Sequence, residues 1–286
     1  MKIIDAHNHP RWLGFGIDKH VANMDELGID VTWLLTWESP PNEHSASNIS
    51  KMNPMRENLI ALEDCVAAAE KYPDRFVPGY CPDPRHPYAI DRLEAAIEIY
   101  GVSICGEWKY RMLFDDPDNI RMWRYCGEKG LPVTIHLDYP SDKVRDNPRT
   151  NYWYGGSMES LERALRAAPE TIVLGHGPGF WATISGDGKH LTESYPNGPV
   201  VSGGALVRMM REYPNLYADN SAGSGHNALT RDREFGRDFI LEFQDRILYA
   251  RDMFDNRHRD MFESFDLPAD VLEKILGGNA LKLAPF

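Results

Sequence analysis

The sequence predicts an α/β protein, a (β/α)8 TIM barrel that forms one domain over residues 1–286. Eight short apolar runs alternate with stretches of helical spacing, as expected when helices connect parallel strands. The chain of 286 residues slightly exceeds the about 250 residues that such a barrel takes, which leaves room for extended loops. The other common solution, an open sheet that binds a dinucleotide, lacks its G-x-G-x-x-G motif after the first strand.

The predicted strands are nearly continuous apolar runs, several of them rich in β-branched residues, as strands buried on both faces are. They span residues 2–9, 31–37, 76–81, 102–109, 132–138, 171–177, 216–221 and 247–252. Long loops rich in Gly, Pro, Asn and Ser are expected at 37–54, 139–156 and 178–199. Each follows a strand, and TIM-barrel enzymes build their sites from the loops at that end of the barrel.

Helical spacing of apolar residues between the strands predicts the helices. They are expected at residues 55–71, 89–100, 120–129, 158–168, 205–213 and 231–243. In the first of these, Leu59, Leu62 and Val66 recur at helical spacing. Gly101 and Gly130 stand where helices commonly end in the left-handed conformation.

Composition and charge disfavour several other classes of protein. No run approaches the roughly 18 to 20 apolar residues that cross a bilayer, so no membrane partner is expected. The net charge of −12, from 43 acidic and 31 basic residues, disfavours a nucleic-acid partner bound through its phosphates. The four cysteines form no C-x-x-C pair, and the N-terminus lacks a secretory signal. We therefore expect a soluble, cytoplasmic enzyme with a small-molecule substrate, and a homodimer is one option for its assembly.

Polar side chains occur at the carboxyl ends of several predicted strands. His7 and His9 end the first strand, and because alternate residues share a face, they can bind one metal ion together. His136, His176 and Asp252 end the fifth, sixth and eighth strands, and a closed barrel brings these ends to one mouth. Each residue alone has a structural explanation, such as a hydrogen-bonded core histidine or an N-cap aspartate. Together, buried imidazoles and a carboxylate are costly to desolvate without a cation, so the pattern favours a metal site.

The fourth strand and two loops add further candidates. Cys105, Glu107 and Lys109 share a face, and Cys105 lies deeper, where we expect a buried core thiol. Lys109 is a candidate substrate-binding residue. Arg11 closely follows the two histidines of the first strand, and its guanidinium suits a substrate carboxylate. Trp181 follows the sixth strand and is a candidate to cover a ring of the substrate.

These motifs resemble the amidohydrolase superfamily, in particular the amidohydrolase-related branch that includes aminocarboxymuconate semialdehyde decarboxylase. The resemblance implies that His7, His9, His136 and Asp252 bind a divalent metal ion. It also implies that His176 orients the attacking water or polarises the substrate, and that Asp252 is the general base. The matching segments span the chain in the correct order and are Ile4-Asp5-Ala6-His7-Asn8-His9, His136, Gly175-His176-Gly177, Asp252 and Ile275-Leu276-Gly277-Gly278-Asn279-Ala280-Leu281.

The number and identity of the ions stay open. Zinc is the default for such ligands, with Mn²⁺, Fe²⁺, Co²⁺ and Ni²⁺ as alternatives, and one ion is favoured over two. Other branches carry a bridging glutamate or a carbamylated lysine on the fourth strand, so Glu107 could bind a metal or shuttle a proton. Alternatively, Glu107 pairs with Lys109 or Arg111, or accepts a hydrogen bond from a ligand histidine. One departure is Arg251, where the family often has a small residue; strand alternation points it away from Asp252, toward an ion pair behind the site.

The first hypothesis for function is a metal-dependent hydrolase. In it, metal-activated water attacks the carbonyl carbon of an amide, lactone or ester in a small polar or carboxylated substrate. The alternative that the resemblance implies is a metal-dependent lyase that decarboxylates an unsaturated or aromatic acid. A third hypothesis is an inactive binding barrel. Without a metal, however, no interaction would compensate the desolvation cost of its three histidines and one aspartate.

Overall fold

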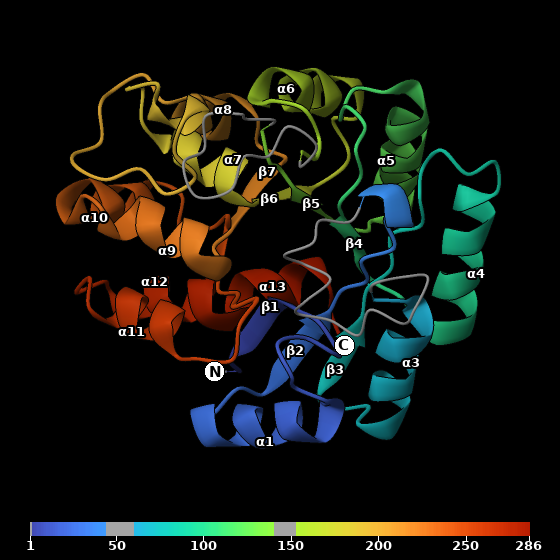
Figure 1. The fold of residues 1–286 in the computed structure, drawn as a ribbon. Helices are drawn as coiled ribbons and strands as arrows, with labels where there is room; N and C mark the ends of the chain where they lie inside the picture. Colours follow the sequence, from blue (N-terminus) through green and yellow to red (C-terminus); the bar gives the residue numbers. More distant parts are fainter. Residues whose placement is uncertain (1, 44–59, 140–152) are drawn as a thin grey trace.

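Parallel strands run through the middle of the molecule, and helices surround them (Figure 1). The fold is given by a computed structural model that describes residues 2–43, 60–139 and 153–286. Each strand of this part of the chain lies within a predicted apolar run, so the predicted strands are confirmed. They are β1 (Ile4–Asn8), β2 (Val31–Leu34), β3 (Phe76–Pro78), β4 (Cys105–Trp108), β5 (Val133–His136), β6 (Val173–His176), β7 (Leu216–Asp219) and β8 (Ile247–Leu248).

The strands form a ring in chain order. Parallel pairing joins β1, β2 and β3, and a second parallel series joins β4 through β8. At one seam between the two series, the N–H of Tyr80 donates to the carbonyl oxygen of Ile104 at 2.9 Å. At the other seam, the N–H of Asp252 donates to the carbonyl oxygen of His7 at 2.8 Å. These bonds close the ring, and the predicted (β/α)8 barrel is confirmed.

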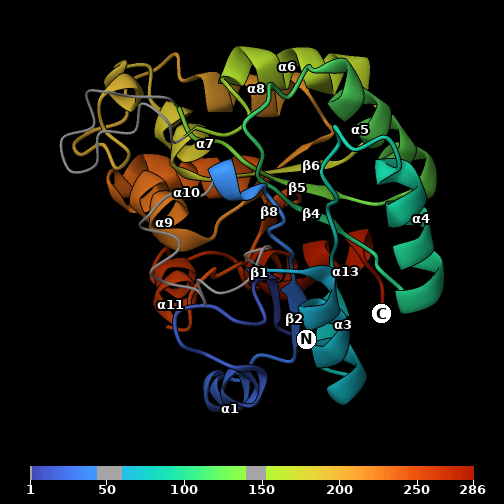
Figure 2. The same ribbon diagram turned by 45° about the vertical axis from the view of Figure 1, so that its right-hand side comes forward.

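The helices pack outside the strands and follow the chain around the barrel (Figures 1 and 2). None of those in the described part of the chain combines the length and apolar content that crossing a membrane requires. The α-helices are α1 (Ile17–Leu27), α3 (Leu62–Lys71), α4 (Ala89–Tyr100), α5 (Pro117–Lys129), α6 (Met158–Ala167), α7 (Pro178–Trp181), α8 (Ala205–Glu212), α9 (Ala222–Thr230), α10 (Arg233–Glu242), α11 (Arg257–Glu263), α12 (Ala269–Glu273) and α13 (Asn279–Leu283). Shorter turns are η1 (Pro41–Glu43), η2 (Ala182–Ile184), η3 (Lys189–Leu191) and the π-helical η4 (Lys274–Gly278).

The helix boundaries partly match the predicted ones. As predicted, α4 and α5 end at Gly101 and Gly130, which adopt φ angles of 66° and 69°. The helix predicted at 55–71 begins only at Leu62, because Ile60 pairs with Trp37 in an antiparallel bridge. Residues 55–59 and most of the loops predicted at 37–54 and 139–156 lie outside the described residues. The loop predicted at 178–199 contains α7, η2 and η3.

Two apolar clusters hold the barrel together. The larger joins the strands to the surrounding helices. The smaller comes mainly from the strands themselves, with Ile4, Trp33, Ile104 and Leu248 among its members, as expected for the packed interior of a barrel. The C-terminal Gly-Gly-Asn-Ala-Leu motif closes against this cluster through the end of η4 and the start of α13. A side chain at Gly277 would collide with the backbone carbonyl of Lys2, just before β1.

Candidate metal centre

The histidines predicted to bind metal lie together at the carboxyl ends of the strands. His7 belongs to β1, and His9 follows that strand directly. Parallel pairing of β5 with β6 sets His136 opposite His176. The ring centroids of His7 and His176 are 4.6 Å apart, and those of His136 and His176 are 5.0 Å apart. The His9 ring lies 5.3 Å from His7 on the other side, so the four imidazoles form one continuous group.

His7, His9 and Asp252 form the first set of ligand atoms, all within 4.8 Å of one another. Nδ1 of His9 donates to the carbonyl oxygen of Leu35 at 2.8 Å, so Nε2 is left to face Asp252 Oδ1 at 3.6 Å. Burial lowers the pKa of His9 to about 4 and raises the pKa of Asp252 to about 6. Asp252 has a φ of 49°, in the left-handed region, and this turn follows β8.

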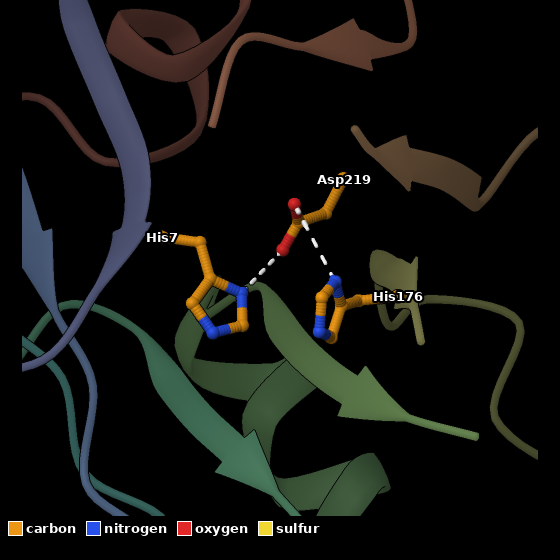
Figure 3. Close-up of side chains that lie close together, drawn as sticks. All are labelled: His7, His176 and Asp219. Carbon is orange, nitrogen blue, oxygen red and sulfur yellow. Dashed lines mark hydrogen bonds and ion pairs between the residues drawn. The ribbon is translucent and has the colours of Figure 1, made fainter. Parts of the chain in front are cut away.

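Asp219, at the end of β7, orients His7 (Figure 3). Its Oδ2 accepts a hydrogen bond from His7 Nδ1 at 2.5 Å, and its Oδ1 accepts from the backbone N–H of Ser221 at 2.9 Å. Burial alone lowers the pKa of His7, but the Asp219 carboxylate outweighs burial and raises that pKa to about 9. With Nδ1 bonded to Asp219, His7 presents Nε2 as its ligand atom, an arrangement typical of metal-binding histidines.

Glu107 of β4 and His136 belong to a second set of ligand atoms. Glu107 Oε1 lies 2.8 Å from His136 Nδ1, and His136 Nε2 lies 2.8 Å from Asp138 Oδ2. Both ring nitrogens of His136 therefore face carboxylates, and metal binding through His136 requires one of these contacts to open. Burial raises the pKa of Glu107, but the Lys109 ammonium at 3.9 Å and His136 outweigh burial and hold that pKa well below its usual range.

His176 belongs to two groups of residues that could hold a metal ion. One group consists of His176, His7 and Asp219, and the other consists of His176, Glu107 and His136. His176 Nδ1 lies 2.8 Å from the Ser221 hydroxyl, and its Nε2 lies 3.9 Å from Glu107 Oε1. Burial holds the pKa of His176 well below its usual range, so the ring is neutral. A neutral imidazole in this place can accept a proton, donate a hydrogen bond or bind a metal.

Three buried polar atoms at this site have no hydrogen-bond partner among the described residues: His7 Nε2, Glu107 Oε2 and Asp252 Oδ1. The two carboxylate oxygens face His9 Nε2 at 3.8 and 3.6 Å. An unsatisfied buried polar atom costs about 1–3 kcal/mol, and one divalent cation would satisfy several of them together. Imidazole nitrogens and carboxylate oxygens are ligands that zinc and manganese accept, so the donor set fits such an ion.

Lys109 lies beside this site against aromatic side chains. Its Nζ is 3.7 Å from the centroid of the Trp37 ring and 5.5 Å from that of the Tyr154 ring. The Trp12 ring lies 6.5 Å from the Trp37 ring and 5.5 Å from the His9 ring. We call Trp12, Trp37 and Tyr154 the aromatic box. It adjoins the candidate metal ligands through His9.

Arg11 lies where a protein carboxylate satisfies it. Its Nη2 donates to Asp64 Oδ2 of α3 at 2.5 Å. The ion pair neutralises the guanidinium that was expected to stand beside the metal. Binding of a substrate carboxylate by Arg11 stays a prediction, and it requires Arg11 to bond the substrate beside or in place of Asp64.

Trp181 is part of the core. Its side chain is fully buried, and its Nε1 donates to the carbonyl oxygen of Asp219 at 2.9 Å. The indole also packs edge-on against Phe180 and Phe239. Trp181 therefore supports the strand that carries Asp219, and its contact with a substrate ring stays a prediction.

Two expectations about buried residues near the site are confirmed. Arg251 points away from Asp252, and its Nε donates to Asp5 Oδ2 at 2.8 Å in a fully buried ion pair. Cys105 is a buried core thiol.

Asp138 and Ser221 are site residues that the sequence analysis does not single out. Asp138 stands two residues after His136, and this H-x-D spacing is a usable signal because alternate residues of a strand share a face. Ser221 reaches His176 only because β7 pairs with β6. No spacing in the sequence indicates that contact.

The profile of the family described as Amidohydrolase matches residues 4–286. The chain belongs to the amidohydrolase family. The match covers every candidate ligand of this amidohydrolase, from β1 to the turn after β8. No curated protein matches the sequence significantly.

Solved structures resemble this amidohydrolase in fold at low sequence identity. An uncharacterized TIM-barrel protein from Bordetella bronchiseptica is 19% identical with a TM-score of 0.64, and 99% of this chain and 98% of that one are covered. A dihydroxybenzoic acid decarboxylase from Polaromonas, with bound manganese and the inhibitor 2-nitroresorcinol, is 16% identical with a TM-score of 0.62. The match covers 99% of this chain and 96% of that one. A probable 2-pyrone-4,6-dicarboxylic acid hydrolase from Acinetobacter baumannii is 12% identical with a TM-score of 0.56, and both chains are covered in full, at 100%.

Proposed function

We propose that this amidohydrolase is a metal-dependent hydrolase that acts on the amide, lactone or ester carbonyl of a small, carboxylated substrate. The observation that carries the proposal is the set of buried unpaired atoms, His7 Nε2, Glu107 Oε2 and Asp252 Oδ1. His9 Nε2 lies beside the two carboxylates, and these four residues would hold the ion. A divalent ion bound there lowers the pKa of water toward about 7, which supplies a nucleophile near neutral pH.

Two residues of the chain are suited to move the protons. Asp252 has an unpaired carboxylate oxygen, and burial raises its pKa to about 6, so it can take a proton near neutral pH. His176 is held by Ser221 through Nδ1 and directs Nε2 toward the Glu107 side of the site. We assign Asp252 the role of general base and His176 the role of hydrogen-bond donor to the substrate carbonyl oxygen.

Metal analysis combined with turnover tests this proposal. Wild-type protein prepared without chelator is expected to hold about one divalent ion per chain, and zinc and manganese are compared by reloading. His7→Ala and Asp252→Ala are expected to lose most of the ion, because each removes a ligand. The matched control is His226→Ala, since His226 lies on α9 outside the site. Full retention of metal by both ligand variants would contradict the proposal.

His176→Asn separates catalysis from metal binding. The variant is expected to keep the ion, while turnover falls by about 10²- to 10⁴-fold, the usual range for a lost acid–base group. Loss of the ion would show instead that His176 is a ligand. Glu107→Gln addresses the metal count. If Glu107 bridges, wild type should bind up to two ions and the variant should keep only the tighter one. If Glu107 only bonds a ligand histidine, occupancy should stay near one while metal affinity or turnover falls by about 10- to 100-fold.

Decarboxylation of an aromatic acid is the second candidate. It is favoured by the aromatic box beside His9 and by the resemblance to a dihydroxybenzoic acid decarboxylase that holds manganese. The two reactions differ in their products: decarboxylation releases carbon dioxide, whereas hydrolysis of an ester or lactone releases acid and consumes base. A panel of carboxylated lactones, esters and aromatic acids, followed by both readouts, decides between them.

A further inference from the structure

Lys109 carries a nearly buried ammonium group that has no hydrogen-bond acceptor in the described part of the chain. The residue is 6% exposed, and no described residue accepts a hydrogen bond from its Nζ. Glu107 Oε1 lies 3.9 Å away, beyond hydrogen-bond distance, and is already bonded to His136 Nδ1 at 2.8 Å. An ammonium has three N–H donors, and neither the Glu107 oxygen at 3.9 Å nor a ring face gives them a hydrogen-bond acceptor. The arrangement therefore leaves donors ready for a ligand.

The aromatic box holds this ammonium in place. Its Nζ lies over the Trp37 ring at 3.7 Å and near the Tyr154 ring at 5.5 Å. Cation–π contacts of this kind contribute about 0.5–2 kcal/mol, but they do not use the directed N–H donors. The rings are also suited to stack against a flat, conjugated ligand. The box thus offers a fixed positive charge next to flat apolar surfaces.

We propose that Lys109 anchors a substrate carboxylate while the flat body of the substrate packs against the aromatic box. The proposal rests on the hydrolase function above and adds the charge and shape of its substrate. The Trp12 ring lies 5.5 Å from the His9 ring, so a ligand on the box adjoins the metal ligands. Arg11, the other cation near the first strand, already pairs with Asp64.

The anchored carboxylate is one that the reaction leaves intact. An ammonium that binds a carboxylate stabilises the ground state, and loss of carbon dioxide from that group would forfeit the contact in the transition state. Hydrolysis at a different carbonyl keeps both the charge and the anchor. Lys109 therefore favours hydrolysis of a carboxylated, conjugated lactone or ester over decarboxylation of the anchored group.

Equilibrium binding tests the proposal without turnover. The probes are 2-naphthoate and its neutral analogue 2-naphthamide, titrated by calorimetry into chelator-treated and manganese-loaded protein. Wild type is expected to bind 2-naphthoate about 10- to 100-fold more tightly than 2-naphthamide in both forms, the range for a charge-assisted hydrogen bond. Lys109→Met should abolish the preference, and Lys109→Arg should retain most of it. Lys129→Met, the same change at an exposed lysine of α5, is the matched control.

Three results would overturn the proposal: no preference for 2-naphthoate in wild type, a preference that needs the metal, or a preference that survives in Lys109→Met. The wild-type comparison alone decides the matter if Lys109→Met does not fold. The metal content of the same samples is measured separately. A protein that binds metal and hydrolyses esters but shows no carboxylate preference retains the proposed function and loses only the role of Lys109.

Discussion

Asp219 determines how His7 can act, because its carboxylate accepts the Nδ1 proton and leaves Nε2 as the ligand atom. Without a metal, this contact raises the pKa of His7 to about 9, so the ring is protonated at neutral pH. Metal binding at Nε2 must displace one proton, and the proton on Nδ1 stays with Asp219. Metal affinity should therefore depend on a residue that need not touch the ion.

Asp219→Asn tests this dependence. The amide keeps an acceptor for Nδ1 but removes the negative charge, and metal affinity is expected to fall by about 10- to 100-fold. Competition with a chromogenic chelator measures the change, and Asp255→Asn on the surface is the control. Unchanged affinity in Asp219→Asn would mean that His7 does not coordinate the ion.

At this scale, the sequence predicts residues whose role depends on strand spacing. His7, His9 and Asp252 come together as their positions at strand ends predict. The sequence does not indicate the partners that Arg11 and Trp181 have in the structure, because these partners lie 53 and 38 residues further along the chain. The packing of α3 and β7 determines which partners these two side chains contact.

At the scale of the elements, the buried pair of Asp5 and Arg251 joins β1 to the segment after β8, behind the proposed metal ligands. Asp5 accepts from both the backbone N–H and the Nε of Arg251, at 2.8 Å each, and Arg251 Nη1 donates to Asn23 of α1 at 2.8 Å. One guanidinium thus links the first strand, the last strand and the first helix. This seam carries His7 on one side and Asp252 on the other.

Arg251→Met is expected to destabilise the fold by about 3–5 kcal/mol, because Asp5 becomes an uncompensated buried charge. Urea unfolding followed by circular dichroism measures the loss. The double variant Asp5→Asn/Arg251→Met should recover part of it, since the charge is then removed. Arg257→Met, an exposed arginine on α11, is the control. A double variant as unstable as the sum of both singles would contradict this account.

Glu162 links α6 to α8 and makes that contact sensitive to pH. Its carboxylate accepts from Arg208 at 2.9 Å and from Tyr213 at 2.8 Å. The hydrogen bond from Arg208 is the main cause that lowers the pKa of Glu162 from 4.5 to about 2. A carboxylate whose pKa is lower in the folded state stabilises the fold fully at pH values above its pKa in the unfolded state. This stabilisation is lost as the pH falls toward its pKa in the folded state.

Glu162→Gln is therefore expected to cost about 1 kcal/mol at pH 7, since its partners are partly exposed. The difference from wild type should stay constant down to about pH 5 and shrink below it, because wild-type Glu162 then takes up a proton. Urea unfolding at a series of pH values measures this difference in the free energy of unfolding. Glu263→Gln, which removes an ion pair within one helix, is the control. A difference that grows toward acid pH would refute the assignment.

The helices show where sequence patterns stop being informative. The strands and α4 follow clear apolar runs, but α1 and α9 lie outside the segments predicted to be helical. α1 carries Ile17, Val21, Met24 and Leu27 at helical spacing, and this stripe packs against the core, so its sequence does contain a helix signal. α9 contains Gly223 and Gly225 and has no such stripe, so packing on the barrel, and not intrinsic preference, makes that segment helical.

For the whole molecule, ring closure makes one site from residues up to 245 positions apart, such as His7 and Asp252. The alternation of apolar runs and helical stretches is enough to predict a barrel, and the barrel is enough to predict that strand ends converge. The sequence cannot show that both ring nitrogens of His136 face carboxylates, Nδ1 that of Glu107 and Nε2 that of Asp138. That detail depends on how β4 and β5 pair.

Metal should stabilise the whole barrel, since its ligands come from both sides of the β1–β8 seam. An ion at about a thousand times its dissociation constant stabilises the folded state by about 4 kcal/mol. Calorimetry is expected to show a melting temperature several degrees higher with manganese or zinc than with chelator. Asp252→Ala should lose this difference, because its ligand set is incomplete. Equal shifts in both proteins would place the stabilising ion elsewhere.

The left-handed backbone of Asp252 limits how the site can evolve. Most residues other than glycine, asparagine, aspartate and histidine pay about 1 kcal/mol or more at a φ of 49°, so a glutamate ligand is disfavoured here whatever the metal prefers. His7 belongs to a regular strand, where many side chains fit the backbone equally well. In a selection for a new metal preference, replacements are therefore expected at His7 or His9 before any appear at Asp252.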